Sequence, residues 1–200
     1  MSYRDLYNYC QTLSPKISSK DIKDKVLELT GIGSVKVIAT ALDISKCRGF
    51  YLSATNTSHP LVIQNGGHII ALAREIQNPC WRRFVLVKEL MHLFDNEQEA
   101  TDSAEALDSL LTELSVDGVN RTAQFQSEIN SFWMALAVLC PEQKRQEFET
   151  MRNAGHIDDY GIALQIRIPK QYVPLLFNPN FQGIVQGLLK VPARQLEPVA

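Results

Sequence analysis

Three ionisable side chains stand within little more than one helical turn in this chain: Lys88, Glu89 and His92. Most residues around them, from Phe84 to Phe94, are large and apolar, and a helix that is apolar nearly all round is normally buried. Positions 88 and 92 are one turn apart, so their side chains are expected to share one face of the helix. Ionised groups inside a protein are costly unless they are paired or bind a metal ion. The segment therefore predicts either a buried ion-pair cluster or a metal site.

The spacing matches the frame His-Glu-x-x-His, in which two histidines bind zinc and the glutamate is general base for a metal-bound water. Glu89 and His92 occupy the base and second-ligand positions, whereas Lys88 replaces the first histidine. A Glu-x-x-His triplet also arises by chance. An ordinary helix with a solvated Lys-Glu edge and a hydrogen-bonded core histidine is thus the competing interpretation.

The wider context resembles metallopeptidases of the ImmA/IrrE family. In that family an Arg-Arg-Phe-like element leads into the metal helix, as Arg82-Arg83-Phe84 does here. A second helix carries a Glu-x-Asn-x-Phe-like element, an Ala/Leu-rich run and a closing proline. Here residues 128–132 read Glu-Ile-Asn-Ser-Phe, and the run after them ends at Pro141, about two residues later than is typical. The resemblance covers roughly residues 35–145.

The resemblance implies specific roles for four residues. Glu89 corresponds to the catalytic general base, and His92 and Glu128 correspond to metal ligands. Asp95, one turn after His92, could orient its imidazole by a hydrogen bond, although a surface acid at the helix end is an equal alternative. Met91 departs from the family pattern, where a small residue is common. If the alignment is right, Glu128 and His92 must face each other within a few ångströms.

Lys88 is the main departure from the pattern. A protonated lysine has no lone pair for zinc, and its reference pKa is about 10.4. Since Glu89 and Glu128 favour the charged form, we expect Lys88 to be a structural counter-ion in place of the metal. The chain would then be a pseudoenzyme with a degenerate active site and no cofactor. By resemblance, it would act in bacterial or phage regulation by binding a protein partner such as a transcriptional repressor.

Two other functions stay open. The first is an active zinc metalloendopeptidase that cleaves a transcriptional regulator with an unusual ligand set, for which His156 is the first substitute ligand to consider. The second is an unrelated helical interaction domain whose motif match is accidental. Ser115, Ser127 and the cysteines show no base partner in the sequence, so no nucleophile triad is predicted.

Composition and charge limit the other classes of function. The net charge is -2 and the basic residues are dispersed, so direct nucleic-acid binding is not expected. No apolar run approaches the roughly 18–20 residues of a membrane span, and the N-terminus is unlike a signal peptide. The four cysteines are far apart and form no CxxC pair, which favours free thiols in a reducing compartment. We therefore expect a cytoplasmic protein without a membrane partner.

Periodicity predicts an α+β fold, with a small antiparallel sheet packed against a mostly helical, zincin-like domain. We divide the chain into an N-terminal helical segment (1–34), an ImmA/IrrE-like domain (35–190) and an extended C-terminal tail (191–200). Residues 68–77 are ambiguous between strand and helix. Strands are expected at 35–41, 48–54 and 60–64. Helices are expected at 3–13, 18–29, 80–95, 97–114, 122–140, 142–153 and 158–168.

Overall fold

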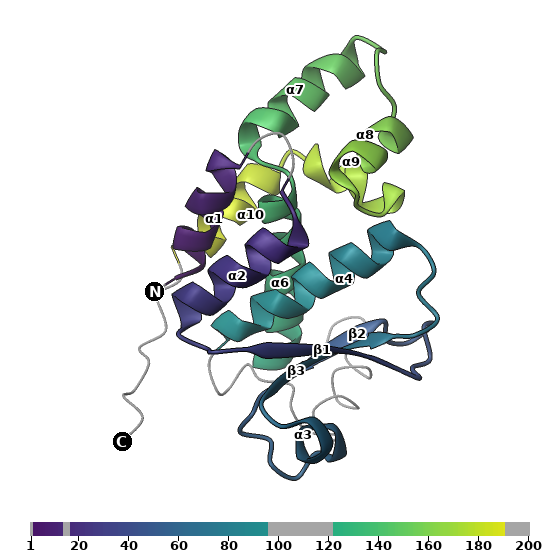
Figure 1. Cartoon of the computed structure of the whole chain (residues 1–200). Helices are drawn as coiled ribbons and strands as arrows, with labels where there is room; N and C mark the ends of the chain where they lie inside the picture. Colours follow the sequence, from purple (N-terminus) through teal and green to yellow (C-terminus); the bar gives the residue numbers. More distant parts are fainter. Residues whose placement is uncertain (1, 14–16, 96–121, 191–200) are drawn as a thin grey trace.

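The computed structural model describes residues 2–13, 17–95 and 122–190 and has an α+β fold in which helices pack on a small sheet (Figure 1). The predicted helix 97–114 and the tail 191–200 lie outside these residues. None of the helices within them is long and apolar enough to span a membrane. The helices are α1 (Tyr3–Thr12), α2 (Ser19–Thr30), α3 (Pro60–Asn65), α4 (Pro79–Met91), η1 (His92–Phe94), α6 (Ala123–Leu139), α7 (Glu142–Asn153), α8 (Asp159–Ile166), η2 (Lys170–Tyr172), α9 (Val173–Leu176) and α10 (Phe181–Leu188).

The sheet has three strands, β1 (Val35–Thr40), β2 (Gly49–Leu52) and β3 (His68–Ala73), in the order β1-β3-β2. β3 pairs with β1 in parallel and with β2 antiparallel. The expectation of a wholly antiparallel sheet was therefore wrong. The physical reason is the composition of β3, which is buried from Ile69 to Ala73. A strand that is apolar on both faces is best placed in the centre of a sheet, where it separates β1 from β2.

The segment expected as a third strand is instead the helix α3. Pro60 occupies its first turn, where a proline costs no backbone hydrogen bond. Nδ1 of His59 accepts a hydrogen bond from the Leu61 amide at 3.2 Å and so caps the helix. Gly66 and Gly67 then take positive φ angles of 67° and 71°, which turn the chain into β3. The ambiguous segment that follows forms the central strand.

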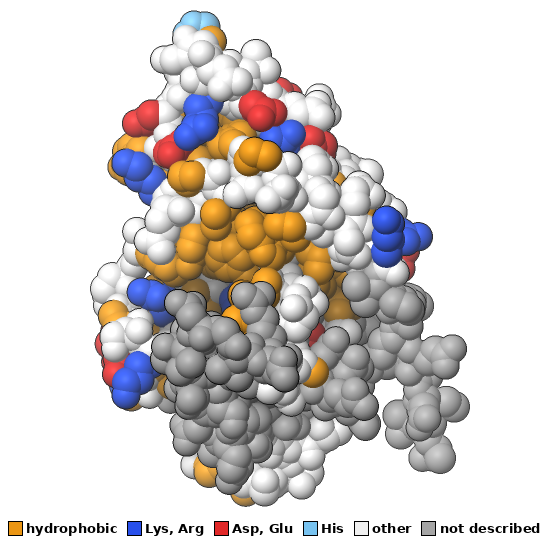
Figure 2. Space-filling model, turned by 180° about the vertical axis from the view of Figure 1, so that it is seen from behind, with side chains coloured by type: hydrophobic (Ala, Val, Ile, Leu, Met, Phe, Trp, Pro, Cys, Tyr) orange, Lys and Arg blue, Asp and Glu red, His pale blue; other side chains and the backbone are white. Residues whose placement is uncertain are grey.

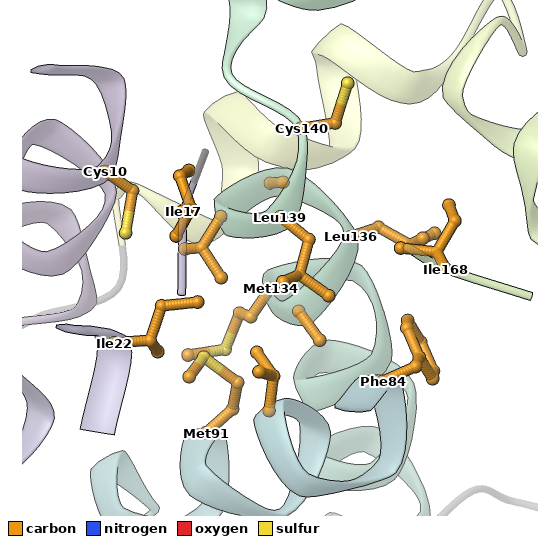
Figure 3. Packing of buried hydrophobic residues seen from close by; sticks show 14 of the residues in the cluster. Cys10, Ile17, Ile22, Phe84, Met91, Met134, Leu136, Leu139, Cys140 and Ile168 are labelled. Atoms are coloured by element: carbon orange, nitrogen blue, oxygen red, sulfur yellow. The ribbon is translucent and has the colours of Figure 1, made fainter. Parts of the chain in front are cut away.

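The helices α4 and α6 cross at the centre of the molecule and hold the core together. The helices of residues 1–34 pack on both of them, as Figure 1 shows, and contribute Leu6, Cys10 and Ile22 to the same hydrophobic core. Figure 3 shows Ile22 beside Met91 of α4 and Met134 of α6. The N-terminal helices therefore help to fix the end of α4 that carries the candidate site.

Gly49 sets the distance between the sheet and α4. A Cβ atom at this position would lie 2.6 Å from Cγ1 of Val85 and 2.9 Å from the carbonyl oxygen of Ala71. We expect Gly49→Ala to lower the free energy of unfolding by about 1–3 kcal/mol, because the backbone contact cannot yield easily. Gly33→Ala is the matched control, since a Cβ there meets nothing within 4 Å. Urea unfolding of both variants measures the difference, and equal losses would contradict the prediction.

Candidate functional site

Two helices position the residues singled out in the sequence. The side chain of Asn78 caps the start of α4, which carries Lys88 and Glu89 near its C-terminal end. His92 follows at once in the turn η1. The hydroxyl of Thr122 accepts a hydrogen bond from the Phe125 amide at 3.2 Å, which fixes the first turn of α6 and hence the position of Glu128.

Lys88 lies between two carboxylates. Its Nζ is 2.9 Å from Oε1 of Glu89 and 2.6 Å from Oε2 of Glu128. The other oxygen of Glu128, Oε1, lies 3.3 Å from Nε2 of His92. Both the contact between His92 and Glu128 and the pairing of Lys88 are thus present as the sequence predicted. One glutamate bridges the lysine and the histidine.

The imidazole of His92 is held on both sides. Nδ1 lies 2.6 Å from Oδ2 of Asp95, so of the two alternatives left open for this aspartate the structure has the one in which it orients the ring. The Ser127 hydroxyl donates to the same Asp95 oxygen at 2.6 Å. Oγ of Ser131 is 3.2 Å from Nε2 and donates to the Glu128 carbonyl oxygen at 3.0 Å. The sequence prediction that Ser127 lacks a base partner was wrong, because its hydroxyl also lies 3.2 Å from Nδ1 of His92. Sequence reasoning missed Ser131, although it lies one turn after Ser127 in an apolar helix.

Charge pairing dominates the protonation states of the site. Burial lowers the pKa of Lys88, but the carboxylates of Glu128 and Glu89 outweigh this effect and hold the pKa well above its usual range. Burial likewise lowers the pKa of His92, and Glu128 and Asp95 together raise it to about 10. Burial raises the pKa of Glu128, yet Lys88 and His92 bring it well below its usual range. The site therefore holds an ammonium and an imidazolium against the Glu128 carboxylate.

Glu89 is the most buried acid of the cluster, with a side chain only 2% exposed. Burial raises its pKa, and the opposing effects of Lys88 and His92 are smaller. Its Oε1 accepts a hydrogen bond from Lys88. The carboxyl group that the resemblance assigns as the general base is therefore already hydrogen-bonded to Lys88.

These residues do not fit a zinc ion. The Lys88 ammonium offers no lone pair and lies between Glu89 and Glu128, and a metal ion would first have to displace the proton from Nε2 of His92. Within residues 2–13, 17–95 and 122–190, no group of three or more His, Cys, Asp or Glu side chains is arranged to hold a metal ion. Figure 1 shows the connection between α7 and α8 well away from the C-terminal end of α4. His156 belongs to this connection, so the structure does not bring this substitute ligand to the site.

The hydrogen bonds also align Ser131, His92 and Asp95 in the order of a nucleophile, a base and an orienting acid. That order alone would suggest acyl transfer. However, Ser131 is only 1% exposed, so a substrate carbonyl cannot reach its hydroxyl. His92 is already protonated, because its pKa is raised to about 10 by Glu128 and Asp95 against the effect of burial. The three residues thus form a structural network.

Protonation of His92 makes the stability of the protein depend on pH. The groups facing its ring are Asp95, Glu89 and Glu128, together with the hydroxyls of Ser127 and Ser131, and Lys88 pairs with the other oxygen of Glu128. The folded-state pKa of about 10 exceeds the ordinary value of 6.5. The stabilisation is therefore complete below pH 6.5 and is lost as the pH rises toward 10.

Relative to His92→Gln, wild-type protein should lose about 1.4 kcal/mol of unfolding free energy per pH unit as the pH rises from about 7 toward 10. Urea unfolding at several pH values measures this slope. The variant supplies the control, because it keeps every other titrating group. Identical slopes for the two proteins would show that His92 is neutral in the fold.

Comparisons with protein-family models, curated proteins and solved structures find no match. The class of site must therefore be defined from its own geometry. It is a buried cluster of two cationic and three acidic side chains, held between α4 with η1 and α6.

Proposed function

We propose that this chain is a regulatory pseudopeptidase with an ImmA/IrrE-like, zincin-type fold that binds a protein partner. The observation that carries the proposal is the position of the Lys88 ammonium, 2.9 Å and 2.6 Å from the carboxylates of Glu89 and Glu128. In the family resemblance, these two residues are the general base and a metal ligand. The ammonium therefore contacts both groups that a zinc ion and its water would need.

The charge balance of the cluster supports the same proposal. A zinc ion with neutral histidines would bring two positive charges between Glu89, Glu128 and Asp95. Protonated Lys88 and His92 bring two positive charges without a metal. This substitution keeps the buried carboxylates compensated, which a neutral residue at position 88 would not do. The fold can then persist while the hydrolytic function is lost.

Lys88 and Glu128 are also the most accessible members of the cluster, with side chains 18% and 22% exposed. A partner that covers them would meet a pair that is already neutralised. The cluster itself is thus expected to contribute shape rather than charge to binding. By the family resemblance, a transcriptional repressor is the kind of partner we propose, bound without cleavage.

Metal analysis tests this function. We expect protein purified without chelator to contain far less than one zinc ion per chain. After incubation with zinc, it should show no hydrolysis of a denatured protein substrate such as casein. Elemental analysis and gel-based proteolysis provide the two measurements.

The outcomes separate the competing functions. If the protein contains about one zinc ion per chain and hydrolyses the substrate, and if Glu89→Gln abolishes that hydrolysis, then the protein is an active metallopeptidase and the proposal is wrong. Zinc without hydrolysis would show that His92 and Glu128 bind metal despite Lys88, and the counter-ion role would be wrong.

A further inference from the structure

A row of aromatic side chains borders the cluster. Trp81 of α4, Tyr172 of η2, and Phe132 and Trp133 of α6 are all partly exposed. Their ring centroids follow one another at 5.3 Å from Trp81 to Tyr172, 4.9 Å from Tyr172 to Phe132 and 5.5 Å from Phe132 to Trp133. Figure 2 shows that the face of the molecule opposite to that in Figure 1 carries a broad hydrophobic surface.

Arg48 stands at one end of this row. It is exposed, it precedes β2, and its guanidinium carbon lies 4.2 Å above the centre of the Trp81 ring. Among the residues that the structure describes, no acidic side chain forms an ion pair with it. Stacking on an aromatic ring holds a guanidinium in place while leaving its N–H groups free to bind an anion.

The row lies beside the cluster along both α4 and α6. Phe132 follows Glu128 by one helical turn of α6, and Lys88 follows Trp81 by about two turns of α4. The two cations near this surface therefore differ in their pairing. Lys88 is matched by two carboxylates, whereas no acidic side chain of the described residues pairs with Arg48.

We propose that the row binds an extended peptide segment of a partner protein in which an acidic residue stands beside apolar or aromatic residues. The carboxylate would pair with Arg48, and the neighbouring apolar side chains would cover Trp81, Tyr172 and Phe132. A planar guanidinium can bind a carboxylate through two parallel hydrogen bonds, which gives direction as well as affinity. This inference rests on the proposed partner-binding function and names the chemistry of the segment that is bound.

The charge on the surface favours a peptide over a nucleic acid. Aromatic rings and arginine can also stack on bases, but nucleic-acid binding depends on several cations that neutralise phosphates. This row has one cation that no acid pairs within residues 2–13, 17–95 and 122–190, and the chain as a whole carries a net charge of -2. A single carboxylate flanked by apolar side chains is the better electrostatic match.

An array of N-acetylated hexapeptides tests the inference on the full-length protein. Each position on a Leu/Phe background is replaced in turn by Asp, Glu, Asn, Gln or Lys. We expect wild-type protein to retain the best acidic peptides at least tenfold more strongly than their amide counterparts. Arg48→Ala should reduce this preference to less than about twofold, whereas the matched control Arg82→Ala, an exposed arginine next to Trp81, should keep it. Thermal unfolding would confirm that both variants are folded.

Equal binding of acidic and amide peptides, or an acidic preference that survives Arg48→Ala, would overturn the inference. So would stronger binding of oligothymidylate than of any peptide, or self-association in sedimentation that Trp81→Ala abolishes. The last two would identify a nucleic acid or a second copy of the chain as the occupant. These outcomes are distinct from failure of the pseudopeptidase proposal. That proposal depends on zinc content and hydrolysis, whereas the peptide-binding inference depends on the preference for acidic over amide peptides.

Discussion

Lys88→His is expected to convert the cluster into a zinc site with a higher affinity for the metal than the wild-type cluster has. The substitution removes the ammonium from between Glu89 and Glu128 and supplies a second imidazole one turn before His92. Zinc would displace the proton from Nε2 of His92, which already lies 3.3 Å from Glu128. Two histidines and a glutamate form a known catalytic zinc set.

Isothermal titration calorimetry should show one zinc ion bound per chain of the variant. At free zinc one hundred times the dissociation constant, the free energy of unfolding should rise by about 2.7 kcal/mol. Lys88→Gln is the first control, because it removes the ammonium without adding a ligand. Lys88→His combined with Glu128→Gln is the second, and it should bind zinc at least tenfold more weakly than Lys88→His alone. If Lys88→His gains no affinity for zinc over wild-type protein, the correspondence with the His-Glu-x-x-His frame is wrong.

The centre of the site could be predicted because its residues belong to two strongly patterned helices. Lys88 and His92 had to share a face once the helix was recognised, since their spacing is one turn. The partner helix was identified by its resemblance to a known motif, which pointed to Glu128. The distance of 3.3 Å between Nε2 of His92 and Oε1 of Glu128 agrees with that predicted contact. The family relationship itself stays a proposal.

Contacts between segments distant in sequence could not be predicted in the same way. Arg48 follows a loop, and nothing in its neighbourhood indicates that it stands over Trp81. Arg83 was noted as part of a motif, yet its guanidinium donates to the carbonyl oxygens of Ile17, Ile166 and Arg167. It thereby joins the chain before α2 and the end of α8 to α4.

The order and direction of the strands also depend on contacts between distant segments and could not be predicted from the sequence. The apolar run of β3 identified a buried segment, but the direction of its neighbours depends on the path that the chain takes through β2 and α3. The segment after His59 was misassigned because its apolar residues suit a strand, whereas Pro60 and the His59 cap favour a helix. Local capping decided the conformation there, and packing decided the topology.

Lys88→Met should be among the most destabilising single substitutions in the chain. It leaves the Glu89 carboxyl, 2% exposed, and Glu128 without the cation that they share. Removing one partner of a buried ion pair typically costs about 3–5 kcal/mol, which is a large part of the stability of a domain of this size. Urea unfolding at neutral pH measures the loss. Lys20→Met is the matched control, because Lys20 pairs with Asp24 at an exposed site where water screens the pair, so its loss should be much smaller.

A second substitution separates charge from packing. If the loss in Lys88→Met comes from an uncompensated carboxylate, then Lys88→Met combined with Glu128→Gln should recover stability relative to Lys88→Met alone, even though it removes a further charged group. If the loss comes from poor packing of the new side chain, the two changes should add. A cost for Lys88→Met no larger than that for Lys20→Met would contradict the counter-ion role. Lysine at position 88 would then have no structural role in place of a metal.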